Sequence, residues 1–250
     1  MKYFLLSTSR SGSDLLRHLL MNVFSENNDG PDEWIVDSRT RLNLGLPENY
    51  EDAMKMVLDN PDTLINRMSS DSHRKVMYIH LGTTHNLPNH IPVIHLIRKD
   101  SMAQAISYWT MKQNTIPPHV DYEKHQELSK KNIFININYD EIETLAKWFY
   151  RQKQNWYFAL KKRPNTLLFY YEEDLENIEV FKKTTLPKIE VFLKKMRKEE
   201  EFDFPLKKTS SLYTIQNLEP EKIKKLTKKY YFNPSFKYWL KHQIKYLLGK

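Results

Sequence analysis

The side chains best suited to chemistry form a short polar turn near the start of the sequence. Residues 7–13 place serines, Thr8 and Gly12 around the cation Arg10. The apolar run 3–6 before the turn predicts a buried strand, and leucines at helical spacing after it predict a helix, for which Ser11, Ser13 and Asp14 are suitable N-caps. Turn N–H groups, a helix N-terminus and a nearby cation together bind phosphate. We therefore predict an anion site, the alternative being an ordinary turn with an exposed arginine.

This turn differs from the two common phosphate-binding loops. The Walker A pattern G-x-x-x-x-G-K-[ST] and the dinucleotide pattern G-x-G-x-x-G each need more than one glycine. Gly12 is the only glycine among the first 29 residues. Both loop types are therefore excluded here.

A second basic turn follows the strongest strand pattern of the chain. Residues 92–97 read PVIHLI and are followed by Arg98, Lys99 and Asp100, and then by a helical pattern that Asp100 or Ser101 can cap. Ligands of parallel α/β sheets bind at the carboxyl ends of the strands. Arg10 and Arg98 are thus expected at one sheet edge, where they could hold a ligand with two separated phosphate groups.

The composition indicates a globular protein with a basic surface. The chain has 250 residues, 40% of them apolar, a formal net charge of +8, and no cysteine. The charge suits an anionic ligand, a nucleic acid or a membrane surface without choosing among them. The missing cysteines exclude disulfides and thiolate metal sites. No apolar run approaches the roughly 20 residues that span a bilayer, and no signal peptide is recognised, so we expect a cytoplasmic protein.

The remaining patterns place these turns in an α/β fold with a largely parallel sheet. Further strands are predicted over 76–81 and 166–171, and a long aromatic helix over 139–162. Residues 111–139 look irregular and could form a lid or acceptor loop, and the part after the acidic turn 172–174 looks helical. No repeat or long linker divides the chain, so we expect a single domain over residues 1–250.

Four motifs, in order, resemble sulfotransferases that use 3′-phosphoadenosine-5′-phosphosulfate (PAPS), in particular the bacterial trehalose 2-sulfotransferase-like family. Residues 6–13 look like the 5′-phosphosulfate loop, and residues 95–100 with the Gln-Ala-x-Ser-x-Trp pattern of 104–109 look like the 3′-phosphate motif. Residues 31–34 match a Pro-x-Glu-aromatic turn, and residues 171–175 resemble a Tyr-Glu-Asp-Leu motif. The resemblance implies a three-layer P-loop-type α/β domain with a central, mostly parallel sheet flanked by helices.

The resemblance also implies roles for individual residues. Arg98 and Ser107 would hold the 3′-phosphate, and Glu33 would be the general base that takes the proton from an acceptor hydroxyl, with Asp32 as the alternative base. The 5′-phosphosulfate would lie against Arg10, which would also stabilise the leaving phosphate, and against Ser11, Gly12, Ser13 and Asp14. PAPS would be the donor, adenosine 3′,5′-bisphosphate (PAP) the product, and no metal would be needed.

The residue types agree with this chemistry. Sulfuryl transfer resembles phosphoryl transfer, in which positioning and electrostatics dominate. A positioned base assists attack by a hydroxyl, typically by ~10²–10⁴-fold. Arginine cannot realistically donate a proton, so a general acid would have to be another group. His80, His85 and His95 are candidates by type alone, and an ordinary core or surface role suits each of them better.

Some positions depart from the family pattern. Asp14 stands where the family usually has a hydroxyl residue, and its carboxylate would repel phosphate unless it caps the helix or points away. The expected glycine–lysine strand motif is not recognisable at 76–80. Lys207, Lys208 and Ser210 are only a guess for the later nucleotide contact. The paired lysines of the C-terminal part are interpreted mainly as solvated helix faces.

Together these observations favour a sulfotransferase that moves the sulfuryl group from PAPS to a hydroxyl of a carbohydrate or small metabolite. One alternative is a degenerate relative that binds the nucleotide without transfer. Another is a basic nucleic-acid-binding protein, although no helix-turn-helix, zinc or RNP motif is visible. A P-loop kinase fits less well because the Walker lysine is missing. We expect no specific nucleic acid partner, and membrane contact is a less favoured interpretation of the basic charge. The sequence does not indicate an oligomeric state.

Overall fold

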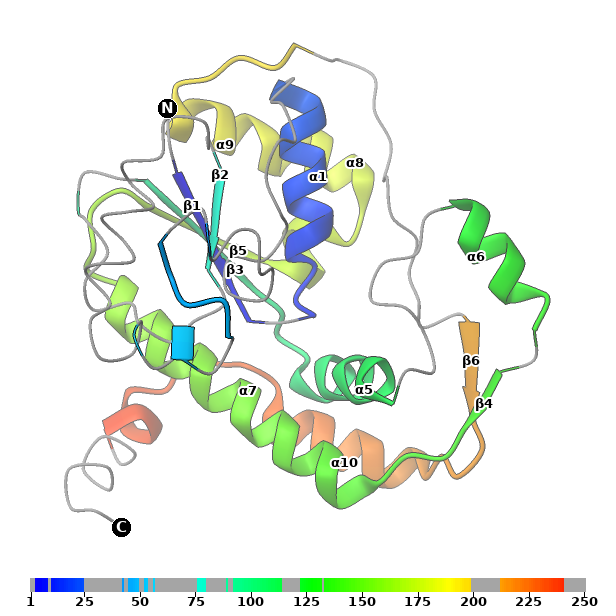
Figure 1. The fold of residues 1–250 in the computed structure, drawn as a ribbon. Helices are drawn as coiled ribbons and strands as arrows, with labels where there is room; N and C mark the ends of the chain where they lie inside the picture. Colours follow the sequence, from blue (N-terminus) through cyan, green and yellow to red (C-terminus); the bar gives the residue numbers. More distant parts are fainter. Residues whose placement is uncertain are drawn as a thin grey trace.

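The computed structural model describes residues 3–8, 10–24, 42, 45–49, 52–53, 56, 76–79, 89, 92–113, 122–131, 133–198 and 212–240. Its centre is a parallel sheet of four strands in the order β2-β1-β3-β5 (Figure 1). The strands are β1 (Tyr3–Ser7), β2 (Val76–Ile79), β3 (Val93–Ile97) and β5 (Thr166–Tyr170). The predicted α/β fold with a central parallel sheet flanked by helices is confirmed.

The register of the sheet brings the ends of three strands to one edge. Ser7 pairs with Leu96, and Ile97 pairs with Tyr170. Because these strands are parallel, the segments that follow them all leave the sheet at its carboxyl edge. The turns that begin at residues 8, 98 and 171 are therefore neighbours in space.

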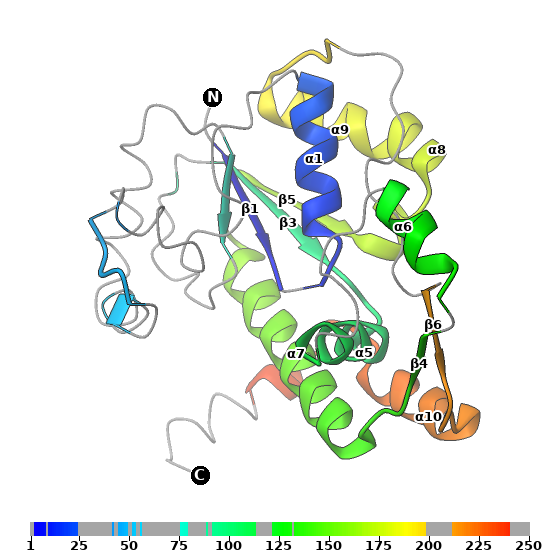
Figure 2. The same cartoon turned by 45° about the vertical axis from the view of Figure 1, so that its right-hand side comes forward.

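Helices cover both faces of the sheet (Figures 1 and 2). Lys195 Nζ lies 5.2 Å from the ring centroid of Tyr3 and 5.3 Å from that of Phe24, which places Tyr3 on the face covered by α1 (Ser13–Phe24) and α9 (Leu186–Leu193). His95 lies on the other face, 6.1 Å from the ring of Trp156 in α7 (Tyr139–Leu160). Leu6 is the register partner of His95 and shares its face. The sheet is thus the middle of three layers.

The long helix α7 begins at a side-chain cap and follows the predicted pattern. Asn138 Oδ1 accepts hydrogen bonds from the backbone N–H groups of Asp140 and Glu141, at 3.1 and 3.4 Å. This satisfies donors that have no partner inside the helix. Of the five side chains expected to point inward, Ile142, Phe149, Trp156 and Leu160 are buried and Leu145 is half-buried.

Helix α5 (Ser101–Lys112) packs against α7 and carries the second basic turn at its start. Asp100 is its N-cap, since Oδ1 accepts from Ala103 N at 2.8 Å. The predicted cap at this position is confirmed. Helix α10 (Pro220–Tyr230) completes this side of the molecule.

Two expectations about irregular segments are wrong. Residues 122–129 form helix α6 (Tyr122–Ser129), and residues 133–135 form strand β4 (Ile133–Ile135), where a loop was expected. Strand β6 (Tyr213–Ile215) interrupts the expected helical C-terminal part and pairs in parallel with β4. Three-residue strands carry too few positions for a period-2 pattern, and each exists because of a distant partner.

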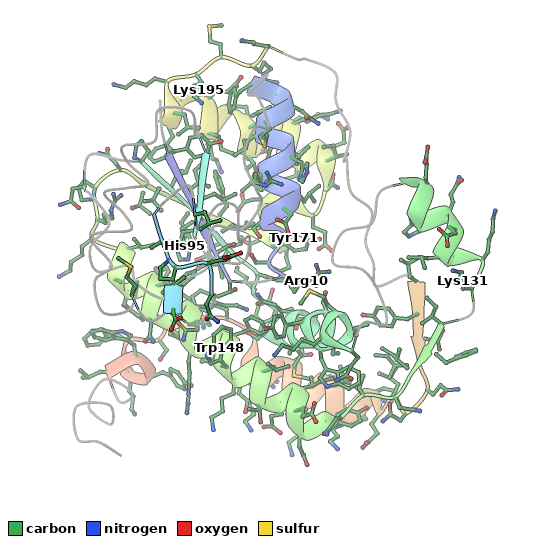
Figure 3. The ribbon with its side chains drawn as sticks, viewed as in Figure 1. Arg10, His95, Lys131, Trp148, Tyr171 and Lys195 are labelled. Carbon is green, nitrogen blue, oxygen red and sulfur yellow. The ribbon has the colours of Figure 1, made fainter. Side chains whose placement is uncertain are left out.

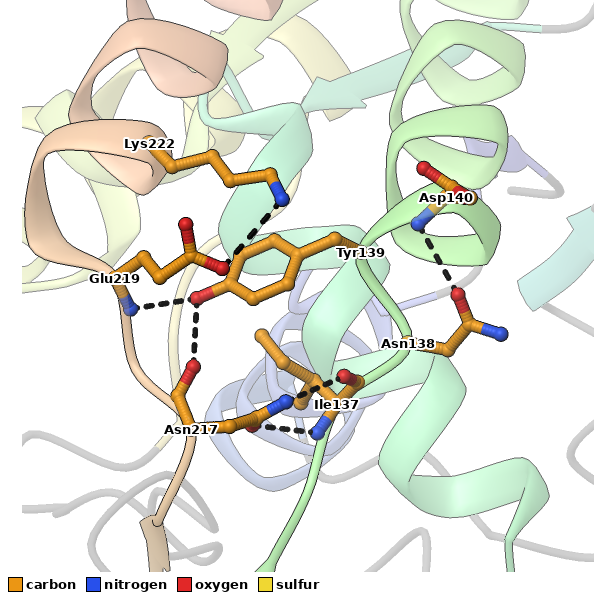
Figure 4. A network of polar contacts seen from close by, with 7 residues as sticks. All are labelled: Ile137, Asn138, Tyr139, Asp140, Asn217, Glu219 and Lys222. Carbon is orange, nitrogen blue, oxygen red and sulfur yellow. Dashed lines mark hydrogen bonds and ion pairs between the residues drawn. The ribbon is translucent and has the colours of Figure 1, made fainter.

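A polar network holds this small sheet against the start of α7 (Figure 4). The Tyr139 hydroxyl donates to Asn217 O at 3.0 Å and accepts from Glu219 N at 2.6 Å. The Asn217 side chain pairs with the backbone of Ile137 through two hydrogen bonds of 2.8 and 2.9 Å. Lys222 Nζ lies 4.1 Å from the Tyr139 ring centroid. These contacts fix β6 relative to α7.

The acidic turn after β5 is the wide, π-helical turn η1 (Tyr171–Leu175), in which Glu176 N donates to Tyr171 O at 2.8 Å. It is followed by α8 (Ile178–Val180), η2 (Phe181–Thr185) and α9. The Asp174 carboxylate accepts from Tyr170 N at 2.7 Å, and Asp174 O accepts from the Thr185 hydroxyl at 2.8 Å. None of the described helices is long and apolar enough to cross a bilayer.

Candidate anion-binding site

The two predicted basic turns meet. Arg10 has a positive φ of 60°, and its side chain lies between α1 and α5 (Figure 3). Its Nε donates to Ser107 Oγ in the middle of α5 at 3.1 Å. Residues that the resemblance assigns to two different phosphates are therefore in direct contact.

Arg98 supports the same turn from the end of β3. Its Nη1 donates to the carbonyl oxygen of Arg10 at 3.2 Å, and its Cζ lies 5.1 Å from the ring centroid of Tyr171. The guanidinium is thus oriented by a backbone acceptor and an aromatic face. Two arginines therefore lie at the carboxyl ends of adjacent strands.

Gly12 is required by both conformation and space. Its φ is +86°, and a Cβ atom added there would lie 2.4 Å from Cδ2 and 2.5 Å from Cε2 of Tyr171. Positive φ is costly for residues with a side chain. The glycine therefore lets the turn after β1 pack directly against η1.

Two buried donors at the site have no hydrogen-bond partner among the residues that the structure describes. They are the Ser11 hydroxyl, on a side chain with 0% exposure, and Nε of Arg98. Buried polar atoms normally find a partner. Nearby, Gln104 Nε2 donates to Thr8 Oγ1 at 2.7 Å, which joins Thr8 of the same turn to α5. An anion would supply the acceptors that these two donors lack.

The start of α1 shows which residue holds its N-cap position. Leu16 N donates to Gly12 O at 3.0 Å, and the helix begins at Ser13, so Gly12 holds the cap position that was expected of Ser11, Ser13 or Asp14. Glycine suits that position because of its conformational freedom. Asp14 lies in the first turn instead, where the helix dipole favours a carboxylate.

The Glu172 side chain binds the backbone of the second basic turn. Its two carboxylate oxygens accept from Lys99 N at 2.9 Å and from Asp100 N at 3.0 Å. The neighbouring Glu173 forms an ion pair with the Lys99 side chain. The motif at 171–175 thus contributes two groups to the site: the Tyr171 ring, which lies against Arg98, and the Glu172 carboxylate, which binds the backbone of the turn. The sequence did not indicate this contribution of Glu172.

Tyr213 of β6 is a further residue that the sequence reading missed. Burial raises the pKa of its phenol, whereas contact with Thr110 and the positive charges of Arg98 and Arg10 act in the opposite direction. Tyr213 therefore shares the electrostatic environment of the two arginines. No local signal marks it, since β6 itself is invisible in the sequence pattern.

His95 does not meet the requirements of a general acid. Its side chain is 2% exposed, and burial lowers its pKa to about 3, so it is neutral near pH 7. Its burial agrees with the interpretation of His95 as an ordinary core residue.

Several predicted residues lie outside the described part of the chain: Asp32, Glu33, His80, His85, Lys207, Lys208 and Ser210. Among the described residues, no group of three or more histidine, aspartate or glutamate side chains is arranged to hold a metal ion.

Comparison with known proteins adds little to this geometry. No family model matches the sequence, and no curated protein matches it. A sulfotransferase structure from Alicyclobacillus acidocaldarius aligns over 92% of this chain and 90% of its own length, with 12% identity and a TM-score of 0.45. So distant a likeness assigns no activity and no residue roles.

Proposed function

We propose that the chain is a sulfotransferase that moves the sulfuryl group from PAPS to a hydroxyl of a carbohydrate or small metabolite. The observation that carries the proposal is the meeting of Arg10, Arg98 and Ser107. Beside them lie two buried donors, Ser11 Oγ and Arg98 Nε, that have no hydrogen-bond partner within the described part of the chain. A ligand with two phosphate-type groups matches the charge and the donors of this edge. The same residues belong to the motifs that resemble the trehalose 2-sulfotransferase-like family.

The residues of the turn would bind and orient the donor. The Ser11 hydroxyl and the first N–H groups of α1 are suited to the 5′-phosphosulfate, because helix N-termini attract anions. Arg10 would offset the charge that grows on the leaving phosphate. Arg98 and Ser107 would hold the 3′-phosphate. PAPS itself would supply the activated sulfuryl group.

The acceptor side of the proposal rests on Glu33. A carboxylate near the acceptor would take the proton of the attacking hydroxyl. His95 is left out of this scheme because it is buried and neutral. The acceptor class comes from the resemblance alone.

Calorimetric titration with PAP, AMP and ATP tests the donor site. We expect micromolar binding that is selective for PAP, at least tenfold weaker in Arg98→Ala, because hydrogen bonds to charged groups contribute about 1.5–3 kcal/mol each. Arg151→Ala is the matched control, since Arg151 lies on an exposed position of α7. No binding to wild type, or equal binding of all three nucleotides, would overturn the proposal.

A degenerate relative would give a different result. It would bind PAP selectively, yet transfer no label from ³⁵S-labelled PAPS to any member of a broad panel of sugars and small alcohols. Loss of transfer in Glu33→Gln, with PAP binding retained, is the result expected of an active enzyme that uses this base.

A further inference from the structure

Lys153 is a buried lysine directly behind the second basic turn. Its side chain is 1% exposed, and Nζ donates to Ser101 Oγ at 2.9 Å. Ser101 is itself fully buried and is the first residue of α5. The Lys153 amine of α7 therefore contacts the first residue of α5, which lies three positions after Arg98 in the chain.

The surroundings of this amine include groups that oppose its charge and groups that favour it, and the opposing influences are the larger. Burial disfavours an ammonium, and so do the positive end of α5 and the charge of Arg98. The carboxylates of Glu172, from η1, and Asp100, from the turn, favour it. The net result lowers the pKa of Lys153 to about 7.

The same two carboxylates face other groups. Glu172 is bonded to the backbone of Lys99 and Asp100. The phenol of Tyr231 interacts with Glu172, Lys99, Glu173 and Asp100. Lys99 is in turn paired with Glu173. Arg98 is therefore the group in this set whose charge a bound anion would directly offset.

We propose that Lys153 is a positioning residue for the Arg98 turn, and that its amine takes up a proton when a phosphate group binds at Arg98. The nature of the anion rests on the proposed function. A dianion bound at Arg98 offsets the positive charge that opposes the Lys153 ammonium. The carboxylates of Glu172 and Asp100 then stabilise that ammonium. The protonated amine donates to Ser101 and fixes the first residue of α5 under the bound phosphate.

Proton uptake on binding is the direct test. PAP is titrated into the full chain by calorimetry at pH 6 to 8.5, each pH in two buffers of different ionisation enthalpy. At pH 8 we expect uptake approaching one proton per PAP. At pH 6 the amine is already charged and takes up almost no proton, so only proton release from the half-protonated phosphates of the ligand is expected there. Phosphate monoesters have a second pKa near 6 and are dianions at pH 8, so the ligand does not contribute there.

The affinity changes in parallel. By linkage, the dissociation constant of wild type rises by up to about tenfold per pH unit between pH 7.5 and 8.5. Lys153→Met should lose both this dependence and the proton uptake. Lys153→Arg keeps a permanent charge and should bind PAP without uptake. Lys147→Met, an exposed lysine of the same helix, should behave as wild type.

The outcomes separate the two proposals. PAP binding without proton uptake by wild type at pH 8, or with uptake that persists in Lys153→Met, overturns the role of Lys153 and leaves the donor site standing. Failure of wild type to bind PAP overturns the proposed function and this inference with it. If Lys153→Met does not fold, the wild-type measurement and Lys153→Arg still decide.

Discussion

Arg10 Nε lies 3.1 Å from Ser107 Oγ and joins the turn after β1 to the middle of α5. In the chain without ligand, Arg10 thus donates to the hydroxyl that a 3′-phosphate is proposed to use. Arg98 holds the carbonyl of the same Arg10. The two halves of the proposed donor site are consequently a single connected unit.

Ser107→Ala should weaken PAP binding by about tenfold, because one hydrogen bond to a charged group is lost. Calorimetry at pH 7 measures the change. Ser129→Ala is the control. Ser129 is exposed, and among the described contacts its Oγ donates only to Gln126 O within α6. Equal affinities of Ser107→Ala and wild type would remove Ser107 from the site.

Gly12→Ala should destabilise the fold and abolish PAP binding. The new methyl group meets the Tyr171 ring at 2.4 Å and the backbone is at positive φ, for a combined cost of roughly 2–4 kcal/mol. Urea unfolding gives the free energy. Gly45→Ala, at φ 64°, is the comparison for the conformational cost of positive φ, about 1–2 kcal/mol, and a similar loss in both variants would argue against the Tyr171 contact.

Glu172→Gln should lower the free energy of unfolding by roughly 1.5–3 kcal/mol, because a charged acceptor of two backbone N–H groups is replaced by a neutral amide. Its neighbour provides the comparison. Glu173→Gln removes only a partly exposed ion pair with Lys99 and should cost less than about 1 kcal/mol. If the two variants unfold alike, the carboxylate of Glu172 does not anchor the turn.

His95 should make wild type more sensitive to acid than His95→Gln. Its pKa is lowered to about 3 in the folded chain from 6.5, so its stabilising effect is complete above pH 6.5 and is lost as the pH falls toward 3. Between pH 6 and 4, the unfolding free energy of wild type should fall faster by about 1.4 kcal/mol per pH unit. Parallel slopes for the two proteins would show that His95 is not a buried neutral base.

The sequence predicted the elements whose patterns are local. Strands β1 and β3 have apolar runs, and α7 has apolar residues at helical spacing. Asp100 caps α5 by accepting from Ala103 N, three residues later in the chain. The meeting of Arg10 and Arg98 followed from one topological rule, that parallel strands place their carboxyl ends together.

What the sequence could not predict depends on distant partners. Strands β4 and β6 are three residues each and are held by contacts such as that of Tyr139 with Asn217. Lys153 sits in an ordinary helical sequence, and only its contact with Ser101 distinguishes it. The cap of α1 was misassigned to residues with side-chain oxygens, because the close approach of Tyr171 that requires Gly12 is not a local property.

The sheet also constrains how the molecule is made. Phe4 pairs with Val93, and Val93 with Thr166, so each of these pairings closes a loop of many tens of residues. Such long-range contacts form slowly. During synthesis the Arg10 turn emerges early but has neither Arg98 nor Tyr171 to hold it until most of the chain has left the ribosome. Assembly of the anion site is therefore a late event in folding, and ligand binding is expected to report the completed sheet rather than any early intermediate.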